Sequence, residues 1–250
     1  MSHGSLEGAH FDPKITTGIA AYNFGMKQIL ATFDPARIKR PFFLSLSIAP
    51  LFPAGYAHSR RISCDAFATI SNTEYMLNSL TYGWWADGTL YAYNDPDHTV
   101  VYRVHDETPV SEAEGRSRLN ASVIAGTVLF NSDDMTNPEA RRRVETLFTN
   151  HEINALAARG HIFRPVEGDT SASATDVFIL NAPDAFYVAV FNFNNGAAVQ
   201  KTLDFTRIGL QPAQRYTIRD LWTHQVTSAT GSFSLPLAPA ASTILRVTKE

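Results

Sequence analysis

Several features that identify common functional classes are missing from this 250-residue sequence. It contains one cysteine, Cys64, so no internal disulfide can form, and no Cys-x-x-Cys or Cys/His spacing suited to zinc occurs. Basic and acidic side chains number 21 and 24, which gives a formal net charge of −3, and the longest basic run is Arg141–Arg143. This balance argues against a nucleic-acid partner, and the pattern predicts neither a metal ion nor another cofactor.

The sequence also has no targeting segment and no membrane helix. Residues 1–8 have neither the cationic start nor the apolar stretch of a signal peptide, and no uninterrupted apolar run approaches the roughly 18 residues of a membrane helix. Phosphate loops of the Gly-x-Gly-x-x-Gly or Gly-Lys-Ser/Thr type are missing as well. With 44% hydrophobic and 18% charged residues, the composition predicts a soluble globular protein with a substantial core.

Residues 1–168 alternate apolar, β-rich runs with helical stretches. A capping box at Ser71 and Glu74 predicts one helix start, and Asn137 followed by Pro138 predicts another. Alternating β and α elements imply a parallel sheet with right-handed crossovers. Because no nucleotide loop is present, a closed barrel is favoured over an open doubly wound sheet. Further helices are expected over 16–30 and 111–124, and strands are expected over 41–50, 59–65, 88–93 and 126–130. The strand at 41–50 is almost continuously apolar, so it is expected to be covered on both faces.

The size of this part indicates half a barrel. A complete (β/α)8 barrel takes about 250 residues, and this part has four clear strands. We therefore expect an α/β fold in which residues 1–168 form the second half of a (β/α)8 barrel, with about strands 5–8 and helices 4–8. From 172 to 250, short strands separated by turn residues at near-regular spacing predict an antiparallel β-sandwich.

Acidic residues follow the predicted barrel strands, where the chemistry of a barrel collects. Asp65 follows the second strand, Asp95 and Asp97 follow the third, and Asp133 and Asp134 follow the fourth. Carboxylates that converge on one mouth suit glycoside hydrolysis, because that reaction needs a carboxylic acid and a carboxylate together. Arg61 and the aromatic residues Trp84, Trp85, Tyr91 and Tyr93 could bind the sugar there.

Each of these residues also has an ordinary structural interpretation. The Asn-Asp-Pro-Asp motif at 94–97 suits a turn, Asp133 and Asp134 suit the start of the next helix, and Trp85 with its neighbour suits packing of a helix on the barrel. The loop histidines have no i, i+4 metal spacing and are expected to be exposed. Cys64 is expected to be a small packed residue. The sequence leaves these alternatives open.

Taken in order, these motifs resemble a known enzyme family. Arg61-x-x-x-Asp65, then the Asn-Asp-Pro-Asp motif, then a strand ending at Asn131–Asp134 and a sandwich containing Arg219–Trp222 resemble the α-galactosidases of glycoside hydrolase family 27 in clan D. The resemblance implies that Asp65 is the general acid/base, that Arg61 binds sugar hydroxyls and that Asp97 holds galactose hydroxyls. Asp95 and Trp85 complete the candidate substrate-binding set.

The family pattern also implies what the chain does not supply. Residues 3–10 are similar to the loop after the family's fourth barrel strand, so the nucleophilic Asp is expected upstream of Met1, together with other sugar-binding residues. Residues 47–50 have no acid toward the sugar 2-position, so N-acetylgalactosamine or β-L-arabinopyranose stay open beside galactose. The chain alone is expected to be inactive, and half a barrel is expected to pair with its missing half or with itself. A non-catalytic carbohydrate-binding or remnant protein is the alternative. The family is commonly secreted or lysosomal.

Overall fold

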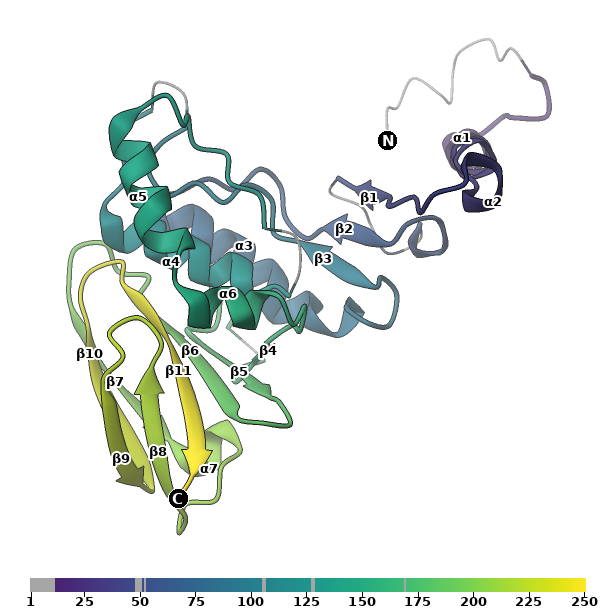
Figure 1. The fold of residues 1–250 in the computed structure, drawn as a ribbon. Helices are drawn as coiled ribbons and strands as arrows, with labels where there is room; N and C mark the ends of the chain where they lie inside the picture. The colour runs from purple at the N-terminus through teal and green to yellow at the C-terminus, as the bar shows by residue number, and fades with distance from the viewer. Residues whose placement is uncertain (1–11, 48–50, 52, 105–106, 127–128, 169) are drawn as a thin grey trace.

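The computed structural model describes residues 12–47, 51, 53–104, 107–126, 129–168 and 170–250. The fold is α/β, with a small parallel sheet and helices in the first part and an antiparallel β-sandwich in the second (Figure 1). The expected loop at 3–10 and part of the expected strand at 126–130 lie outside the described residues. None of the described helices is long and apolar enough to cross a membrane.

The first part consists of short strands and longer helices. They are α1 (Gly18–Thr32), α2 (Pro35–Ile38), β1 (Ser45–Leu46), η2 (Ala54–Tyr56), β2 (Ser59–Arg61), α3 (Ile70–Gly83), η3 (Trp84–Ala86), β3 (Tyr93–Asp95), α4 (Glu112–Ile124), α5 (Pro138–Phe148) and α6 (His151–Ala157). Strands β1, β2 and β3 form one sheet with parallel neighbours, and an isolated parallel bridge joins Thr99 to Asn131. The predicted parallel pairing is therefore present, although each strand is shorter than its apolar run.

Local capping signals explain where the helices begin. Helix α4 starts with a complete capping box, in which the Ser111 hydroxyl accepts from the Glu114 amide and the Glu114 carboxylate accepts from the Ser111 amide. Helix α5 is capped by Asn137, as predicted. The capping box predicted at Ser71 and Glu74 is wrong, because Thr69 caps α3 two residues earlier by accepting from the Asn72 amide.

The expectation that residues 41–50 form a strand covered on both faces is also wrong for the part that is described. Only Ser45 and Leu46 are paired, and the residues 41–47 alternate between exposed and half-buried. Phe43 is 51% exposed. Strand β1 has β2 as its only neighbour within the described sheet, so an apolar run that would suit a central strand occupies an edge.

The second part is built from two antiparallel sheets. The elements are β4 (Arg164–Pro165), β5 (Val177–Asn181), β6 (Phe186–Phe191), β7 (Val199–Asp204), α7 (Phe205–Ile208), β8 (Arg215–Asp220), β9 (Val226–Thr230), β10 (Ser232–Leu237) and β11 (Ser242–Lys249). Six strands follow the order β4-β5-β6-β11-β8-β9, and β10 pairs with β7. The six-stranded sheet already includes β4, upstream of the expected boundary.

Helices α3, α4 and α6 lie between the parallel sheet and the six-stranded sheet (Figure 1). One apolar cluster contains Leu77 from α3, Leu119 from α4, Ile153 from α6 and Phe191 from β6. Helix α4 is buried along most of its length, and it reaches the segment after β3 because position 115 is glycine. A Cβ at Gly115 would lie 2.4 Å from the Val101 carbonyl oxygen. The fold thus presses α4 against the loop that follows β3.

Candidate active site

The charged residues gather where β2 and β3 end. The two strands are parallel neighbours, and Arg61 pairs in register with Asp95, so the segments that follow them leave the sheet at the same edge. Asp65 lies four residues beyond β2, and Asp97 lies two residues beyond β3. Asp97 has φ 68°, in the left-handed region that few residues other than glycine, asparagine and aspartate occupy.

Arg61 connects the two carboxylates. Its Nη2 lies 2.9 Å from Asp65 Oδ1, and its Nη1 lies 3.0 Å from Asp97 Oδ1. The side chains of Arg61 and Asp97 are nearly buried, at 13% and 6% exposure, whereas that of Asp65 is 63% exposed. The arrangement therefore presents one oriented carboxyl group to solvent and supports it from beneath with a buried ion pair.

Asp97 is the centre of the network. Its Oδ2 accepts from the Ala66 amide at 2.8 Å, and its own amide donates to Asp95 Oδ1 at 2.8 Å. Asp95 Oδ2 in turn accepts from the Ser45 hydroxyl at 3.4 Å, which reaches β1. Because Ala66 directly follows Asp65, the position of Asp97 determines the backbone that carries Asp65.

His98 belongs to the same site, although sequence reasoning treated it as an ordinary loop histidine. Its ring stacks on Phe67 with centroids 5.7 Å apart, Nδ1 lies 2.9 Å from the Ser132 hydroxyl, and Nε2 lies 3.5 Å from Asp97 Oδ1. The ring is 42% exposed and stands beside the carboxylates. Its place directly after the Asn-Asp-Pro-Asp motif is the signal that could have found it.

Sequence reasoning also missed Arg118, which lies on α4 beneath the Asp95–His98 segment and is fully buried. Its Nε donates to the His98 carbonyl at 2.8 Å, and its Nη2 donates to the Pro96 carbonyl at 2.6 Å. Burial lowers the pKa of Arg118 to about 10, against the opposing effect of the Asp97 and Asp95 carboxylates. An arginine on the helix face that also carries Ala121 was the available signal, because that face is expected to be buried.

Three other candidates from the sequence lie elsewhere or serve the backbone. Trp85 is in η3, ahead of β3, and its indole N–H donates to the Tyr82 carbonyl at 2.9 Å, so the structure does not bring it to the strand ends where Asp65 and Asp97 lie. Asp133 is buried and accepts from the amides of Val101, Tyr102 and Arg103. Asp134 accepts from the amide and hydroxyl of Thr136, ahead of α5.

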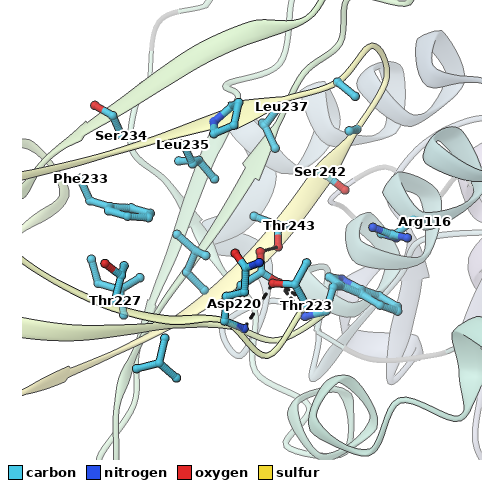
Figure 2. Close-up of a pocket in the computed structure, with 18 residues that line it drawn as sticks. Arg116, Asp220, Thr223, Thr227, Phe233, Ser234, Leu235, Leu237, Ser242 and Thr243 are labelled. Atoms are coloured by element: carbon cyan, nitrogen blue, oxygen red, sulfur yellow. Dashed lines mark hydrogen bonds between the residues drawn. The ribbon is translucent and has the colours of Figure 1, made fainter.

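One pocket in the described part of the chain lies away from these carboxylates. It measures about 620 Å³ and is lined mainly by β8–β11, with Arg116 at its rim (Figure 2). Its carboxylate, Asp220, accepts from the amides of Trp222 and Thr223 and from the Thr243 hydroxyl, so it closes the turn after β8. We take the Asp65–Asp97 cluster as the candidate site, because it joins an exposed, oriented carboxyl group to a buried ion pair at the carboxyl edge of the parallel sheet.

The site offers no evident place for a metal ion. Across the residues that the structure describes, no group of three or more His, Cys, Asp or Glu side chains is arranged to hold one. Asp97 and His98 are neighbours, but the Asp97 oxygens already accept from Arg61 and the Ala66 amide. What the geometry can do is hold one carboxyl group for proton transfer and offer Arg61 and His98 to a polar ligand.

Comparison with known proteins places the fold. Residues 172–247 match the family of the alpha galactosidase C-terminal beta sandwich domain. Over 150 residues the chain is 31% identical to the isomalto-dextranase of Arthrobacter globiformis, which covers 56% of this chain and 23% of that protein.

Solved structures give the same picture at lower identity. A GH27 β-L-arabinopyranosidase from Geobacillus stearothermophilus superposes with a TM-score of 0.73 at 20% identity, covering 91% of this chain and 54% of that one. Alpha-galactosidase I from Mortierella vinacea superposes with a TM-score of 0.73 at 16% identity, and the match covers 93% of this chain and 64% of that one. The chain thus spans about half to two thirds of these structures. Residues 172–247 therefore match the α-galactosidase C-terminal β-sandwich family, and over most of its length the chain has a fold found in the GH27 α-galactosidase-like enzymes.

Proposed function

We propose that this chain carries the acid/base part of a retaining glycoside hydrolase of the α-galactosidase type. The observation that carries the proposal is Asp65, an exposed carboxyl group held by Arg61, which is itself paired with the buried Asp97. The cluster lies at the carboxyl edge of a parallel sheet, where barrel enzymes keep their catalytic groups. The likeness to glycosidases over most of the chain supports this choice of chemistry.

In the proposed reaction, Asp65 protonates the oxygen of the glycosidic bond and then takes a proton from the water that releases the sugar. Arg61 keeps the carboxyl group in place through both steps. Asp97, Asp95 and His98 line the same edge, where they can position sugar hydroxyls. Trp85 has no support from the geometry as a sugar-binding residue, since it belongs to the segment ahead of β3.

A retaining mechanism also needs a second carboxylate about 5–5.5 Å from the acid/base, to attack the sugar. Asp97 is poorly suited, because it is buried and its oxygens accept from Arg61 and the Ala66 amide. We therefore propose that the nucleophile comes from polypeptide outside residues 1–250, and that the chain alone is inactive.

The same polypeptide would complete the sheet. We propose that β1–β3 and the segment at Asn131 are the second half of a (β/α)8 barrel, in which the exposed side chains of the first part face a missing neighbour. Phe43 and Tyr93, whose rings are 6.1 Å apart, are 51% and 43% exposed, and Ile19 and Phe24 on α1 are also exposed. Apolar side chains gathered on one part of a surface are typical of an interface. The other half of the barrel is the proposed partner. When that half is not present, we expect two copies of this chain to associate through the same surface.

The sugar is proposed at the level of class. An α-galactosyl group is the first choice, with β-L-arabinopyranose or N-acetylgalactosamine as alternatives within the same enzyme type. A second candidate, hydrolysis of an isomalto-dextran, is favoured by the 31% identity to the Arthrobacter isomalto-dextranase.

The test is hydrolysis of p-nitrophenyl α-D-galactopyranoside by the 250-residue chain, alone and mixed with the N-terminal half of the barrel as a separate polypeptide. Activity only in the mixture, lost in Asp65→Asn and kept in the matched control Asp134→Asn, is the expected result. Activity of the chain alone would contradict the proposed origin of the nucleophile. Release of isomaltose from dextran in place of galactoside hydrolysis would move the assignment to the second candidate.

A non-catalytic role has its own signature. If the mixture binds galactose or isomaltose by calorimetry, turns over neither substrate and keeps its affinity in Asp65→Ala, the chain is a carbohydrate-binding protein. Loss of all turnover with Asp65→Ala in an active mixture would exclude that role.

A further inference from the structure

Arg118 carries a charge that the proposed reaction does not use. It lies on α4, has no exposed surface, and its Nη1 has no hydrogen-bond partner among the described side chains and backbone. A fully buried, incompletely bonded guanidinium is costly unless an opposite charge lies near it. The carboxylates that face it are Asp97 and Asp95, which oppose the effect of burial on its pKa. The arginine and the two acids therefore form one electrostatic unit.

The hydrogen bonds of Arg118 fall on both sides of Asp97. Nη2 binds the Pro96 carbonyl and Nε binds the His98 carbonyl, at 2.6 and 2.8 Å. The two bonded carbonyls belong to the residues immediately before and after Asp97, whose φ of 68° is unfavourable for a residue with a side chain. One planar guanidinium thus holds the carbonyl groups of the residues on either side of Asp97, which restrains the backbone that directs the Asp97 carboxylate.

The effect reaches the acid/base through Asp97. Its Oδ2 accepts from the Ala66 amide and its Oδ1 pairs with Arg61, so both the backbone next to Asp65 and the guanidinium that holds Asp65 depend on where Asp97 points. Helix α4 itself is anchored on its opposite side, where the Asn120 amide donates to the Ser242 hydroxyl and the Ser117 hydroxyl donates to the Ala240 carbonyl. These two bonds tie α4 to the β-sandwich and do not involve the Pro96–His98 segment.

We propose that Arg118 is a positioning residue for Asp65, which acts through the Pro96–His98 turn and Asp97. The structural half of this proposal stands on the contacts above, and its catalytic half rests on the proposed glycosidase function. Arg118 does not touch the substrate in this assignment. A variant without Arg118 still has the Asp65 carboxyl group, but that group is no longer held in the orientation that proton transfer requires.

The first arm of the test measures amide hydrogen exchange by NMR in the 250-residue chain. Arg118→Met keeps the length of the side chain and removes both bonds and the charge, so the Ala66 amide is expected to exchange about 10-fold faster than in wild type, relative to the core amide of Val188. Arg118→Lys, which restores the charge and one bond, is expected to fall between the two. Asn120→Ala is the matched control, because it weakens the opposite side of the same helix.

The structural half is overturned if Ala66 and Val188 change by the same factor in Arg118→Met, which would mean a general loss of stability. It is also overturned if Asn120→Ala deprotects Ala66 as strongly. This arm needs no catalytic activity, so its outcome stands whether or not the chain proves to be a glycosidase.

The second arm uses the reconstituted enzyme and compares two leaving groups. Methyl α-galactoside needs protonation of its oxygen far more than p-nitrophenyl α-galactoside does, so a misplaced acid/base slows the methyl substrate more. Arg118→Met is expected to lower the ratio of kcat/KM for methyl over p-nitrophenyl substrate by about 10-fold, mainly through kcat, with Arg118→Lys partly restoring it. An unchanged ratio would overturn the catalytic half. Absence of turnover in the wild-type mixture would instead be a failure of the proposed function.

Discussion

Arg61 offers a direct test of how burial sets the strength of an ion pair. Its guanidinium holds Asp65 at 2.9 Å and Asp97 at 3.0 Å, yet the two acids are 63% and 6% exposed. The partner and the geometry are shared, so the difference in burial is the main variable. We expect Asp97→Asn to destabilise the chain strongly and Asp65→Asn to leave its stability nearly unchanged.

The magnitudes follow from the surroundings of each acid. An exposed ion pair contributes roughly 0–1 kcal/mol, which sets the expected loss for Asp65→Asn. Removing one partner of a buried pair costs about 3–5 kcal/mol, because the other charge is left without compensation. In Asp97→Asn the Ala66 amide can still bond to the new amide oxygen and Arg61 keeps Asp65, so we expect the lower end, about 3 kcal/mol.

The assay is urea unfolding followed by circular dichroism at pH 7, with wild type and both variants at 0.1 and 0.5 M salt. Added salt should remove the small effect of Asp65→Asn and leave most of the effect of Asp97→Asn, because screening acts mainly on exposed charges. Equal losses in the two variants, or a loss above about 2 kcal/mol for Asp65→Asn, would refute the argument that burial decides. Such a result would also mean that Asp65 serves mainly to stabilise the fold.

Further predictions concern the rest of the molecule. Burial raises the pKa of Asp87 to about 6 from an ordinary 3.8, so ionisation of this group costs the folded state stability as the pH rises from about 4 to 6. In thermal unfolding, Asp87→Asn should have the same stability as wild type at pH 3.5. At pH 7.5 it should be more stable than wild type by about 1–2 kcal/mol, a figure that allows for partial exposure of the group. Gly115→Ala, whose methyl group would lie 2.4 Å from the Val101 carbonyl oxygen, should cost about 1–3 kcal/mol in urea unfolding, and an unchanged midpoint would mean that α4 can move away from the loop. The chain alone should associate at micromolar concentration in light scattering, and Phe43→Glu with Tyr93→Glu should reduce this association; a monomeric wild type would count against an uncovered interface.

The sequence predicted best what local chemistry determines. The helix starts at Ser111 and Asn137 follow from short-range capping, and the structure has both. Strand β9 lies exposed at the edge of its sheet, and its residues show no alternation of apolar and polar side chains from which its bounds could be predicted. The prediction that residues 41–50 form a strand covered on both faces was wrong for the described part, because hydrophobicity shows that a strand can be buried and does not show which neighbouring strands are present.

The site divides in the same way. Arg61, Asp65 and Asp97 follow strand ends, and parallel pairing brings such positions together, so the structure unites the three residues that strand order selected. Trp85 precedes its strand, and the same rule separates it from them. His98 also follows the end of β3, but strand order alone predicts no role for it, nor any for Arg118 on α4. Their roles depend on α4 lying across the turn after β3 and on a ring stacking on Phe67, and both contacts are tertiary.

The core shared by the helices and the six-stranded sheet bears on how such proteins could recombine. A genetic exchange at residue 172, where the match to the sandwich family begins, would separate Phe178 and Phe191 from the side chains of Leu77 and Leu119 that cover them. Each foreign sandwich would then meet helices shaped for another surface. Lineages carrying this architecture should therefore inherit α3, α4, α6 and the sandwich as one block, and chimaeras joined upstream of α3 should fold more often than those joined at 172.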